Sequence, residues 1–494
     1  CRPLPVATRL LSNRCSSEPL PRRPLFPEEA GFLKESDMKL HTAMRLALNP
    51  AHPDVISVVG GGGKSSAVFR IALDLAKSGR RAVITHTARI AAFQTAWSPA
   101  TVEVLDDTLP WADIESALGS HNVCLLTGPV VADRRAGLPP HLVDELAQRA
   151  ANLGIAAITV EADGSKMRPA KAPADHEPVL PDATTLLTPV LGLDAVGTVI
   201  GPRLFHRDEL VRQVLELPGS TDNRFTPRHA ADLLVHPAGG AKARPSAARL
   251  LPIFNKADTP LRLLFGRLAA RRLAAGGQPA LLTAVGDASR DPVIERWGTI
   301  AVVILAAGTS SRFGAPKQLA VVNGRPMLTS ALAVAAALPG PIYVVTGAYA
   351  AEVQALLDNL PAELRQQLGE RLHVLHNASW ETGQSSSLHV SLRGMPDLVQ
   401  AAIWMPVDQP YLDPLLLCRL ASAWRKGADL AAPEVNGELR GAPALFDRSY
   451  WPELQSVAGD GGGRSVLRHH HEHVFAVAAP ELALRDIDSP SDLT

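Results

Sequence analysis

A short apolar run that opens into a loop of small residues constrains this chain more than any other stretch. Residues 302–308 read VVILAAG, and two cations, Arg312 and Lys317, follow in the same segment. Valine, isoleucine and leucine favour a buried strand, and the small residues after it leave backbone N–H groups open to phosphate oxygens. Arginine adds a planar fork and lysine a point charge. The pattern predicts a phosphate-binding loop at the end of a buried strand, with an ordinary strand-to-helix turn as the alternative.

The longer stretch 302–320, VVILAAGTSSRFGAPKQLA, resembles the signature of the MobA-like NTP transferases. In that family the branch that uses GTP typically reads LAGG, with a DK pair after the second glycine, whereas this chain reads LAAG and PKQL. The resemblance therefore favours the molybdenum cofactor cytidylyltransferases, which use CTP. The segment 377–388, NASWETGQSSSL, resembles a second element of the family, although its serines also suit helix capping. The nucleotide contacts that the resemblance implies are Leu305, Ala306, Ala307, Gly308, Arg312, Lys317, Gly383, Ser385 and Ser386.

Carboxylates that could hold a metal ion lie further along the chain. Asp408 follows the apolar run AAIWMP and stands between two prolines, so we expect it at the carboxyl end of a strand. Nucleotidyl transfer needs Mg²⁺ on the phosphates, and this ion prefers oxygen ligands. The resemblance gives Asp408 this metal role and adds Asp488 as a second ligand, with helix capping as the alternative for Asp488. It also makes Asp460 and Arg464, in GDGGGR, candidates for acceptor contacts, the alternative being a surface turn. Arg312, Lys317 and Asp408 are the predicted catalytic residues.

The glycine run at 60–63 marks a second candidate site. It follows the apolar run VISVV and precedes Lys64, Ser65 and a helical pattern, so it resembles a P-loop, in which backbone N–H groups and a lysine hold phosphates. The spacing is not that of a strict Walker A motif, and a glycine-rich packing turn is the alternative. NKAD at 255–258 resembles the guanine-recognition motif of GTPases. The predicted N-terminal nucleotide site contains Gly61, Gly62, Gly63, Lys64, Ser65, Asn255, Lys256 and Asp258.

Acidic and basic residues cluster after another apolar run, IAAITV at 155–160. Glu161 and Asp163 end this predicted strand, where a carboxylate can hold Mg²⁺ or cap the strand, and Lys166 and Arg168 follow. These four residues form a possible metal or anion site. The segment 161–181, together with the glycine loop, the His206–Arg207 pair and NKAD, resembles the YqeC family. That family comprises accessory proteins of selenium-dependent molybdenum hydroxylases, so the resemblance implies a pathway more than a reaction.

Strands that alternate with helical patterns predict an α/β fold with parallel sheets. We expect a P-loop-NTPase-like domain over residues 38–297 and a Rossmann-like nucleotidyltransferase domain over 298–494. Residues 1–37 are rich in proline and arginine without apolar periodicity, and we expect a disordered or non-native tail there, with Met38 near the natural start.

The composition and charge of the chain limit the kinds of partner that we expect it to bind. The chain has 49 Lys+Arg and 49 Asp+Glu, so no net positive field favours nucleic acid. No apolar run approaches the roughly 20 residues that cross a bilayer. The four cysteines are scattered, which suits a reducing cytoplasm.

The predicted reaction moves CMP from CTP to the phosphate of molybdopterin, giving molybdopterin cytosine dinucleotide and pyrophosphate with Mg²⁺ as cofactor. The resemblances imply an N-terminal domain that binds GTP or ATP and assists maturation of an apo molybdenum hydroxylase of the xanthine dehydrogenase type. Two alternatives remain open: a nucleotidyltransferase for another phosphorylated acceptor, and a nucleotide-gated chaperone for the molybdenum cofactor.

Overall fold

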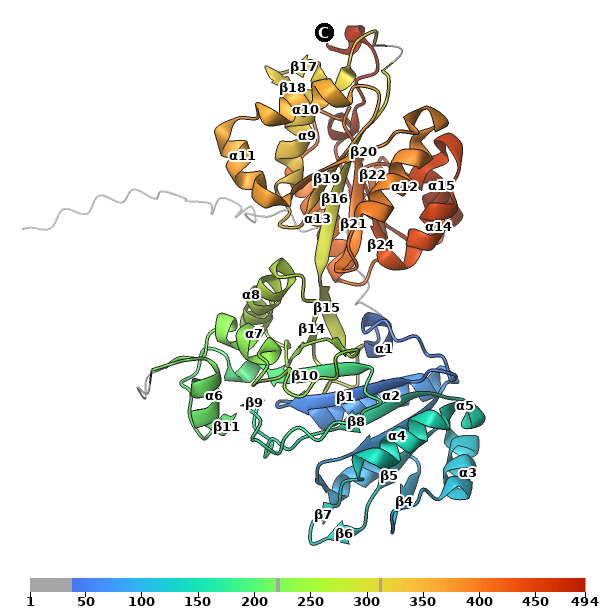
Figure 1. Ribbon diagram of the computed structural model, residues 1–494, viewed down its shortest axis with the longest axis vertical. Helices are drawn as coiled ribbons and strands as arrows, with labels where there is room; N and C mark the ends of the chain where they lie inside the picture. Colours follow the sequence, from blue (N-terminus) through green and yellow to red (C-terminus); the bar gives the residue numbers. More distant parts are fainter. Residues whose placement is uncertain (1–37, 219–222, 311–312, 494) are drawn as a thin grey trace, which may run out of the picture. The chain divides into compact units, whose positions relative to one another are not determined.

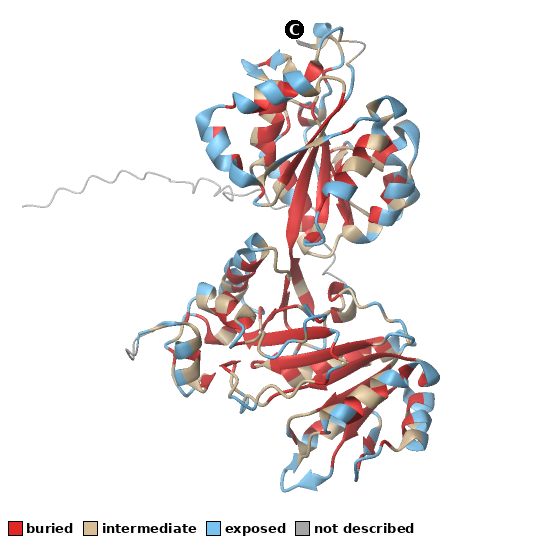
Figure 2. Cartoon of the chain, in the orientation of Figure 1, coloured by how far each residue is buried: buried red, intermediate tan, exposed pale blue. Residues whose placement is uncertain are grey.

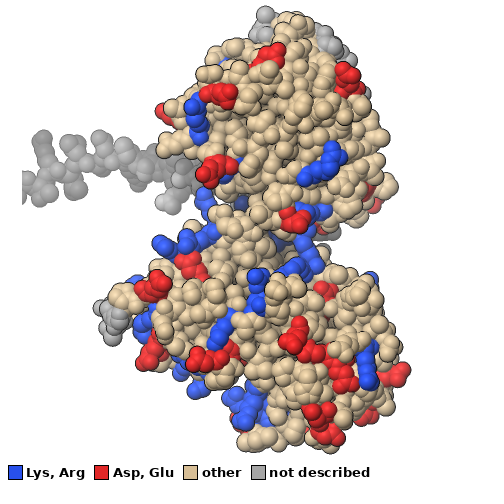
Figure 3. Space-filling view, viewed as in Figure 1, with Lys and Arg blue, Asp and Glu red and all other residues tan. Residues whose placement is uncertain are grey.

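The computed structural model describes residues 38–218, 223–310 and 313–493, with the backbone alone at Asp460 and Leu493. The expected tail over 1–37 and the predicted site residue Arg312 lie outside these ranges. The described chain forms two large sheets, and the last strand of the first ends at Trp297, directly before the second begins at Thr299 (Figure 1). On the face seen in Figure 3, acidic and basic side chains are interspersed, in keeping with the balanced composition. None of the described helices is long and apolar enough to cross a membrane.

The first sheet has ten strands and is parallel except at one edge, where β14 and β15 pair antiparallel. Its order is β15 (Val293–Trp297), β14 (Ala280–Thr283), β13 (Ile253–Asn255), β10 (Leu186–Gly192), β1 (Asp54–Gly60), β8 (Ile155–Glu161), β2 (Arg81–His86), β5 (Val123–Thr127) and β4 (Thr101–Glu103), with β12 (Arg249–Leu250) on β10. The glycine-loop strand β1 thus lies beside β8, the strand that ends in Glu161.

Helices cover both faces of this sheet, because its central strands are apolar on both sides. Ile56 and Val58 of β1 pack with α2, whereas Val55 and Val59 pack with α3 and α4. Figure 2 shows the central strands buried and the outer helix faces exposed. The helices are α1 (Leu40–Ala43), α2 (Lys64–Lys77), α3 (Trp111–His121), α4 (Pro140–Gln148), α5 (Ala150–Leu153), α6 (Asp208–Val214), α7 (Pro227–Val235) and α8 (Pro260–Ala275).

The second sheet has eight strands and carries the signature segment at its centre. Its order is β20 (Leu372–His376), β19 (Ile342–Thr346), β16 (Thr299–Ala306), β21 (Val399–Pro406), β24 (Ala444–Asp447), β22 (Leu430–Val435) and β23 (Glu438–Leu439), with β25 (Val474–Ala478) on β22. The first four strands are parallel, and β24 is antiparallel to both of its neighbours.

Alternate residues of β16 enter two cores, one on each face of the sheet. Val302 and Ile304 pack with α9 and α13, and Ala301 and Val303 pack with α12 and α14. The helices are α9 (Met327–Ala335), α10 (Ala350–Asp358), α11 (Ala362–Leu368), α12 (Gln384–Gly394), α13 (Pro414–Arg425), α14 (Trp451–Ser456) and α15 (Gly462–His469). The predicted α/β class with parallel sheets is confirmed.

Candidate functional site

The signature loop and Asp408 emerge at the same edge of the second sheet. β16 and β21 are parallel neighbours, with Leu305 opposite Pro406 at their carboxyl ends. The chain leaves β16 through Ala307 and Gly308 and leaves β21 through Val407 and Asp408. Ligands of open α/β sheets bind beyond the carboxyl ends of the strands. The strand pairing therefore brings the predicted loop and the predicted metal ligand together.

Lys317 joins the two predicted metal carboxylates. It begins the short helix η3 (Lys317–Leu319), and its Nζ lies 2.7 Å from Oδ2 of Asp408 and 2.8 Å from Oδ1 of Asp488. Burial by itself would lower the pKa of Lys317, but the hydrogen bonds to Asp408 and Asp488 outweigh it, so the pKa lies above its ordinary value. Lys317 is therefore a fixed positive charge at neutral pH.

The donor set at this point fits a divalent cation. Oδ1 of Asp408 is buried and has no hydrogen-bond partner among the described residues. Asp408 and Asp488 each place one oxygen against the same Nζ, so both carboxylates face one point. Asp486 lies beside them, and burial followed by the charge of Asp408 raises its pKa. Hard cations such as Mg²⁺ bind such oxygens.

A cavity of about 420 Å³ opens over the loop and reaches Asp408. Gln318, which is 2% exposed, holds its wall in place: its Nε2 donates to the carbonyl oxygens of Ala306 and Gly308, each at 2.9 Å. Trp380 also lines this cavity. The lining residues are Leu305, Ala306, Ala307, Gly308, Thr309, Ser310, Lys317, Gln318, Trp380, Glu381, Gly383, Gln384, Ser387, Pro406, Val407 and Asp408.

Most of the predicted nucleotide contacts line this cavity, but two serines do not. Oγ of Ser386 accepts from Nδ2 of Asn377 at 2.7 Å and donates to the carbonyl of Gly383 at 2.8 Å. Ser385 is buried, and Gln384 and Ser387 line the cavity instead. The helical register of α12 decides which side chains face the cavity, and the sequence motif alone does not give it.

The structure describes the side chain of only one of the two predicted acceptor residues. Arg464 lines a second cavity that also includes Asp408. The side chain of Asp460 lies outside the described part of the structure. Gln318, Arg440 and Arg485 are residues near Asp408 that the sequence analysis did not single out. Gln318 lies inside the quoted signature, whereas no motif marks either arginine.

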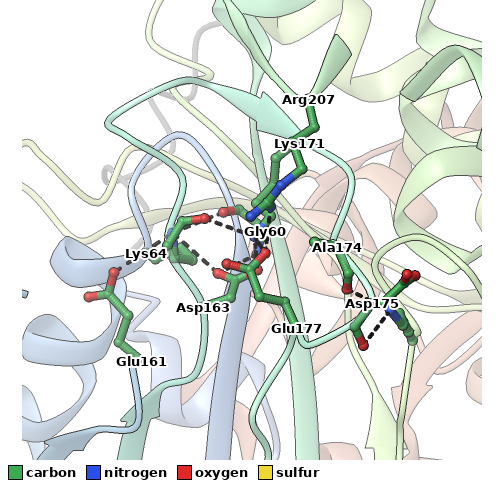
Figure 4. Close-up of polar contacts among 11 residues, drawn as sticks. Gly60, Lys64, Glu161, Asp163, Lys171, Ala174, Asp175, Glu177 and Arg207 are labelled. Carbon is green, nitrogen blue, oxygen red and sulfur yellow. Dashed lines mark hydrogen bonds and ion pairs between the residues drawn. The ribbon is translucent and has the colours of Figure 1, made fainter. Parts of the chain in front are cut away.

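Four of the N-terminal candidate residues, Lys64, Ser65, Glu161 and Asp163, form a buried polar network at the carboxyl ends of β1 and β8 (Figure 4). Nζ of Lys64 donates to the carbonyl of Gly60 at 2.9 Å and lies 3.4 Å from Oδ1 of Asp163 and 3.7 Å from Oε1 of Glu161. Ser65 donates from Oγ to Oε2 of Glu161 at 2.6 Å. Burial is the main cause that raises the pKa of Glu161, against the charge of Lys64.

Lys171 extends this network. Its Nζ lies 2.9 Å from Oδ2 of Asp163 and 2.7 Å from Oε2 of Glu177, which also accepts from Arg207 at 2.6 Å. Burial would raise the pKa of Glu177, but the hydrogen bonds from Arg207 and Lys171 lower it to about 2. Burial, followed by the charges of Arg207 and Lys171, lowers the pKa of His206 to about 4. Glu177 is a partner that sequence patterns did not reveal.

The glycine loop precedes α2, and two of its glycines also pack closely against the backbone of neighbouring segments. A Cβ on Gly61 would lie 2.5 Å from the carbonyl oxygen of Arg168, and one on Gly62 would lie 2.3 Å from the amide nitrogen of Gly192. The N–H groups of Gly61 and Gly62 donate to the carbonyls of Val190 and Arg168. The packing-turn alternative thus accounts for these two glycines. The N–H groups at the start of α2, from Lys64 onward, have no acceptor within the helix.

NKAD lies against the glycine loop. Nδ2 of Asn255 donates to the carbonyl of Gly62 at 2.7 Å, and its Oδ1 accepts from Thr283 and Val285. Lys256 is paired with Asp194 at 2.7 Å, and Asp258 with Arg262 at 2.8 Å.

The two cations predicted beside Glu161 and Asp163 lie outside the buried network. Lys166 is exposed, and the half-buried Arg168 donates to the carbonyl of Phe205. In NKAD, Asn255 is buried against the glycine loop, whereas Lys256 is half-buried and Asp258 is exposed.

A small-residue loop, a buried lysine and two facing carboxylates at one edge of an α/β sheet are the features expected of a site that transfers nucleotidyl groups. Comparison with known proteins agrees. Residues 302–474 match the model of the MobA-like NTP transferase domain, and residues 56–209 match that of the YqeC protein. The C-terminal half is thus a nucleotidyltransferase domain of the MobA type.

Individual relatives cover each half. The "uncharacterized protein YqeC" of Escherichia coli (strain K12) is 32% identical over 205 residues, which is 41% of this chain and 76% of the relative. The chain therefore belongs to the YqeC family. A "probable molybdenum cofactor guanylyltransferase" of Geobacillus sp. (strain WCH70) is 23% identical over 201 residues, 39% of this chain and 95% of the relative. The crystal structure of Rv0371c from Mycobacterium tuberculosis H37Rv is 26% identical, with 39% of this chain and 95% of that chain covered and a TM-score of 0.33.

Proposed function

We propose that the C-terminal half transfers the cytidylyl group of CTP to the terminal phosphate of molybdopterin, with release of pyrophosphate. The observation that carries this proposal is the contact of Lys317 with both Asp408 and Asp488, at 2.7 and 2.8 Å, directly beyond the signature strand. The LAAG and PKQL segments support CTP over GTP, and the molybdenum cofactor relative supports a pterin acceptor.

Each residue has a defined task in this proposal. The loop from Leu305 to Gly308 and the wall formed by Trp380 and Gly383 hold the nucleotide, and Lys317 and Arg312 contact its phosphates. Asp408 and Asp488 would hold Mg²⁺, which neutralises phosphate charge when bound. Lys317, which contacts both carboxylates in the structure, would then neutralise charge on the phosphate oxygens.

The acceptor needs no side-chain base. A phosphate monoester is ionised near neutral pH, so its oxygen attacks the α-phosphorus in line. A new P–O bond forms, the bond to the β-phosphate breaks, and pyrophosphate leaves with the electron pair. Catalysis then depends on positioning and on charge neutralisation.

A nucleotide panel tests the reaction. With molybdopterin as acceptor, we expect pyrophosphate release from CTP and at least tenfold less from GTP, because a polar group of the site that the wrong base leaves unpaired costs about 1–3 kcal/mol. Release with GTP alone would overturn the cytidylyl assignment but keep the transferase. Release with sugar phosphates in place of molybdopterin would identify another acceptor, and no release with any pair would contradict the reaction.

We further propose that the N-terminal half binds the phosphates of GTP or ATP at the start of α2, with Gly63, Lys64 and Ser65 as contacts. The favouring observation is the 2.6 Å hydrogen bond from Ser65 to Glu161, which joins the hydroxyl and the carboxylate that a P-loop places beside Mg²⁺. Asp163, Lys166 and Arg168 would complete the phosphate surroundings, and Lys256 and Asp258 would contact the base.

Calorimetric titration with Mg·GTP and Mg·ATP tests this site. We expect binding of one of them with wild type and at least tenfold weaker binding with Ser65→Ala, which keeps Lys64 in place; Ser78→Ala, at the other end of α2, is the control. Hydrolysis of the bound nucleotide would indicate a switch, and binding without hydrolysis a carrier. Equal affinity in wild type and Ser65→Ala, or no binding at all, would contradict the proposal.

The partner we propose for this half is an apo molybdenum hydroxylase of the xanthine dehydrogenase type, whose activity the full chain should restore in a reconstitution assay.

A further inference from the structure

A second cavity adjoins the first and shares its carboxylate. Its volume is about 700 Å³, and Asp408, Pro406 and Gln384 line both cavities. A ligand in each cavity would therefore approach Asp408 from a different side. Transfer between two substrates requires such an arrangement, because the attacking and the leaving groups lie on opposite sides of the phosphorus atom.

The second cavity differs from the first in its cations. Three exposed arginines line it: Arg440 follows β23, Arg464 belongs to α15, and Arg485 follows η9 (Glu481–Leu484). Among the residues with described side chains, neither Arg464 nor Arg485 has a carboxylate within ion-pair distance. Arg440 lies 3.7 Å from Glu438, which is itself exposed. The guanidinium fork matches the oxygens of a phosphate group.

The lining of this cavity also includes apolar surface. Val435, Ala442 and Leu484 lie along it, and Leu482, which also lines it, is 59% exposed. Gly441 lets Arg464 approach, since a Cβ there would lie 2.7 Å from Nε of Arg464. A pocket with apolar walls and a few placed charges is typical of small-molecule sites. These features together suit a ligand that has an apolar part and carries a phosphate, as the proposed acceptor does.

We infer that the second cavity is the acceptor site, in which Arg440 and Arg485, together with Arg464, bind the phosphate monoester of a heterocyclic acceptor. This inference rests on the proposed function and deepens it. The arginines bind the phosphate that supplies the attacking oxygen and aim it past Asp408 at the α-phosphorus of the nucleotide in the first cavity. They bind substrate in the ground state and the transition state alike, so their loss changes KM more than kcat.

Steady-state kinetics of the full chain with molybdopterin and CTP test the inference. For Arg440→Ala and for Arg485→Ala we expect the KM for molybdopterin to rise about tenfold, because a charge-assisted hydrogen bond is lost. The KM for CTP and kcat stay within about twofold of wild type. Arg485→Lys keeps the positive charge but lacks the guanidinium fork, so its KM for molybdopterin should lie between those of wild type and Arg485→Ala. Arg393→Ala, at the far end of α12, makes the same change of charge outside both cavities and should leave all constants unchanged.

The outcomes separate this inference from the proposed function. If wild type transfers the cytidylyl group but both arginine variants keep the wild-type KM for molybdopterin, the acceptor assignment is wrong and the reaction stands. If the KM for CTP rises instead, the second cavity holds the nucleotide, which also overturns the assignment. Absence of transfer by wild type with every nucleotide contradicts the reaction itself and removes the basis for the acceptor site. Thermal unfolding of each variant shows whether a loss reflects misfolding.

Discussion

Asp408→Ala should lower kcat/KM for nucleotidyl transfer by about 10²–10³-fold or more, while the chain remains folded. The carboxylate has one oxygen on Lys317 and one buried oxygen without a partner among the described residues. Its removal takes away a metal ligand and leaves Lys317 paired with Asp488 alone. Because the residue follows β21 and is not inside it, the strand pairing should persist. Pyrophosphate release measures the first effect, and circular dichroism the second.

Asp397→Ala is the matched control for this prediction. It removes the same charge from the same half of the chain, but Asp397 is exposed and forms a surface ion pair with Arg448. Such pairs contribute little to stability, so we expect wild-type activity. Asp408→Asn, which keeps the shape but loses the charge, should be nearly as inactive as Asp408→Ala. Turnover within a few-fold of wild type in either Asp408 variant would rule out the metal assignment.

The sequence allowed the fold class and the strands next to the candidate sites to be predicted, because 302–305 is a continuous apolar run before alanine and 55–59 is apolar except for Ser57 and precedes glycine. One central strand of the first sheet, β10, was not predicted. β10 pairs with β1, and Pro189 lies opposite Val59 within it. Proline lacks the N–H of a ladder bond and normally argues against a central strand, so the run at 186–192 was not predicted as a strand. Only the three-dimensional pairing with β1 and β13 identifies it as a strand.

The candidate site was predictable to the extent that it lies at the ends of neighbouring strands. Lys317 and Asp408 follow β16 and β21, and parallel pairing brings such ends to one edge. The contact of Lys317 with Asp488 spans 171 positions and depends on how the C-terminal segment returns to the sheet. Arg440 and Arg485 follow no motif, since exposed arginines are common and only a shared cavity distinguishes them. Patterns in sequence show the strand ends, and tertiary structure decides which loops meet there.

The glycine loop illustrates the same limit in the other half. Its composition is compatible with phosphate binding and with close packing, and the structure contains the contacts of both. Gly61 and Gly62 lie against Arg168 and Gly192, whereas Lys64 and Ser65 face the carboxylate of Glu161. Only residues after Gly62 therefore remain candidates for contact with a phosphate group.

Lys64→Met should destabilise the N-terminal half by about 3 kcal/mol, because it leaves buried carboxylates without their cation. Lys64 is 4% exposed and contacts both Glu161 and Asp163, but Lys171 still pairs with Asp163 in the variant. The loss therefore falls mainly on Glu161, whose pKa burial already raises. A carboxyl group whose pKa is higher in the folded than in the unfolded state lowers the free energy of unfolding as the pH rises above its unfolded-state pKa. The deficit of Lys64→Met should accordingly be small near pH 4.5 and grow toward neutrality.

A double-mutant cycle with Glu161→Gln locates this effect. If the lysine mainly compensates Glu161, the double variant is more stable than the sum of the two single changes predicts, by about 1 kcal/mol or more. Lys77→Met is the control, because it lies in the same helix with a 75% exposed side chain and a loose 3.9 Å contact to Asp74. Denaturant unfolding followed by circular dichroism at several pH values gives all four free energies. Strict additivity, or a deficit that does not change with pH, would mean that Lys64 acts through packing and not through charge. In that case Glu161 would be held as a neutral acid that donates a hydrogen bond, and the N-terminal site would lack the carboxylate that its proposed Mg²⁺ requires.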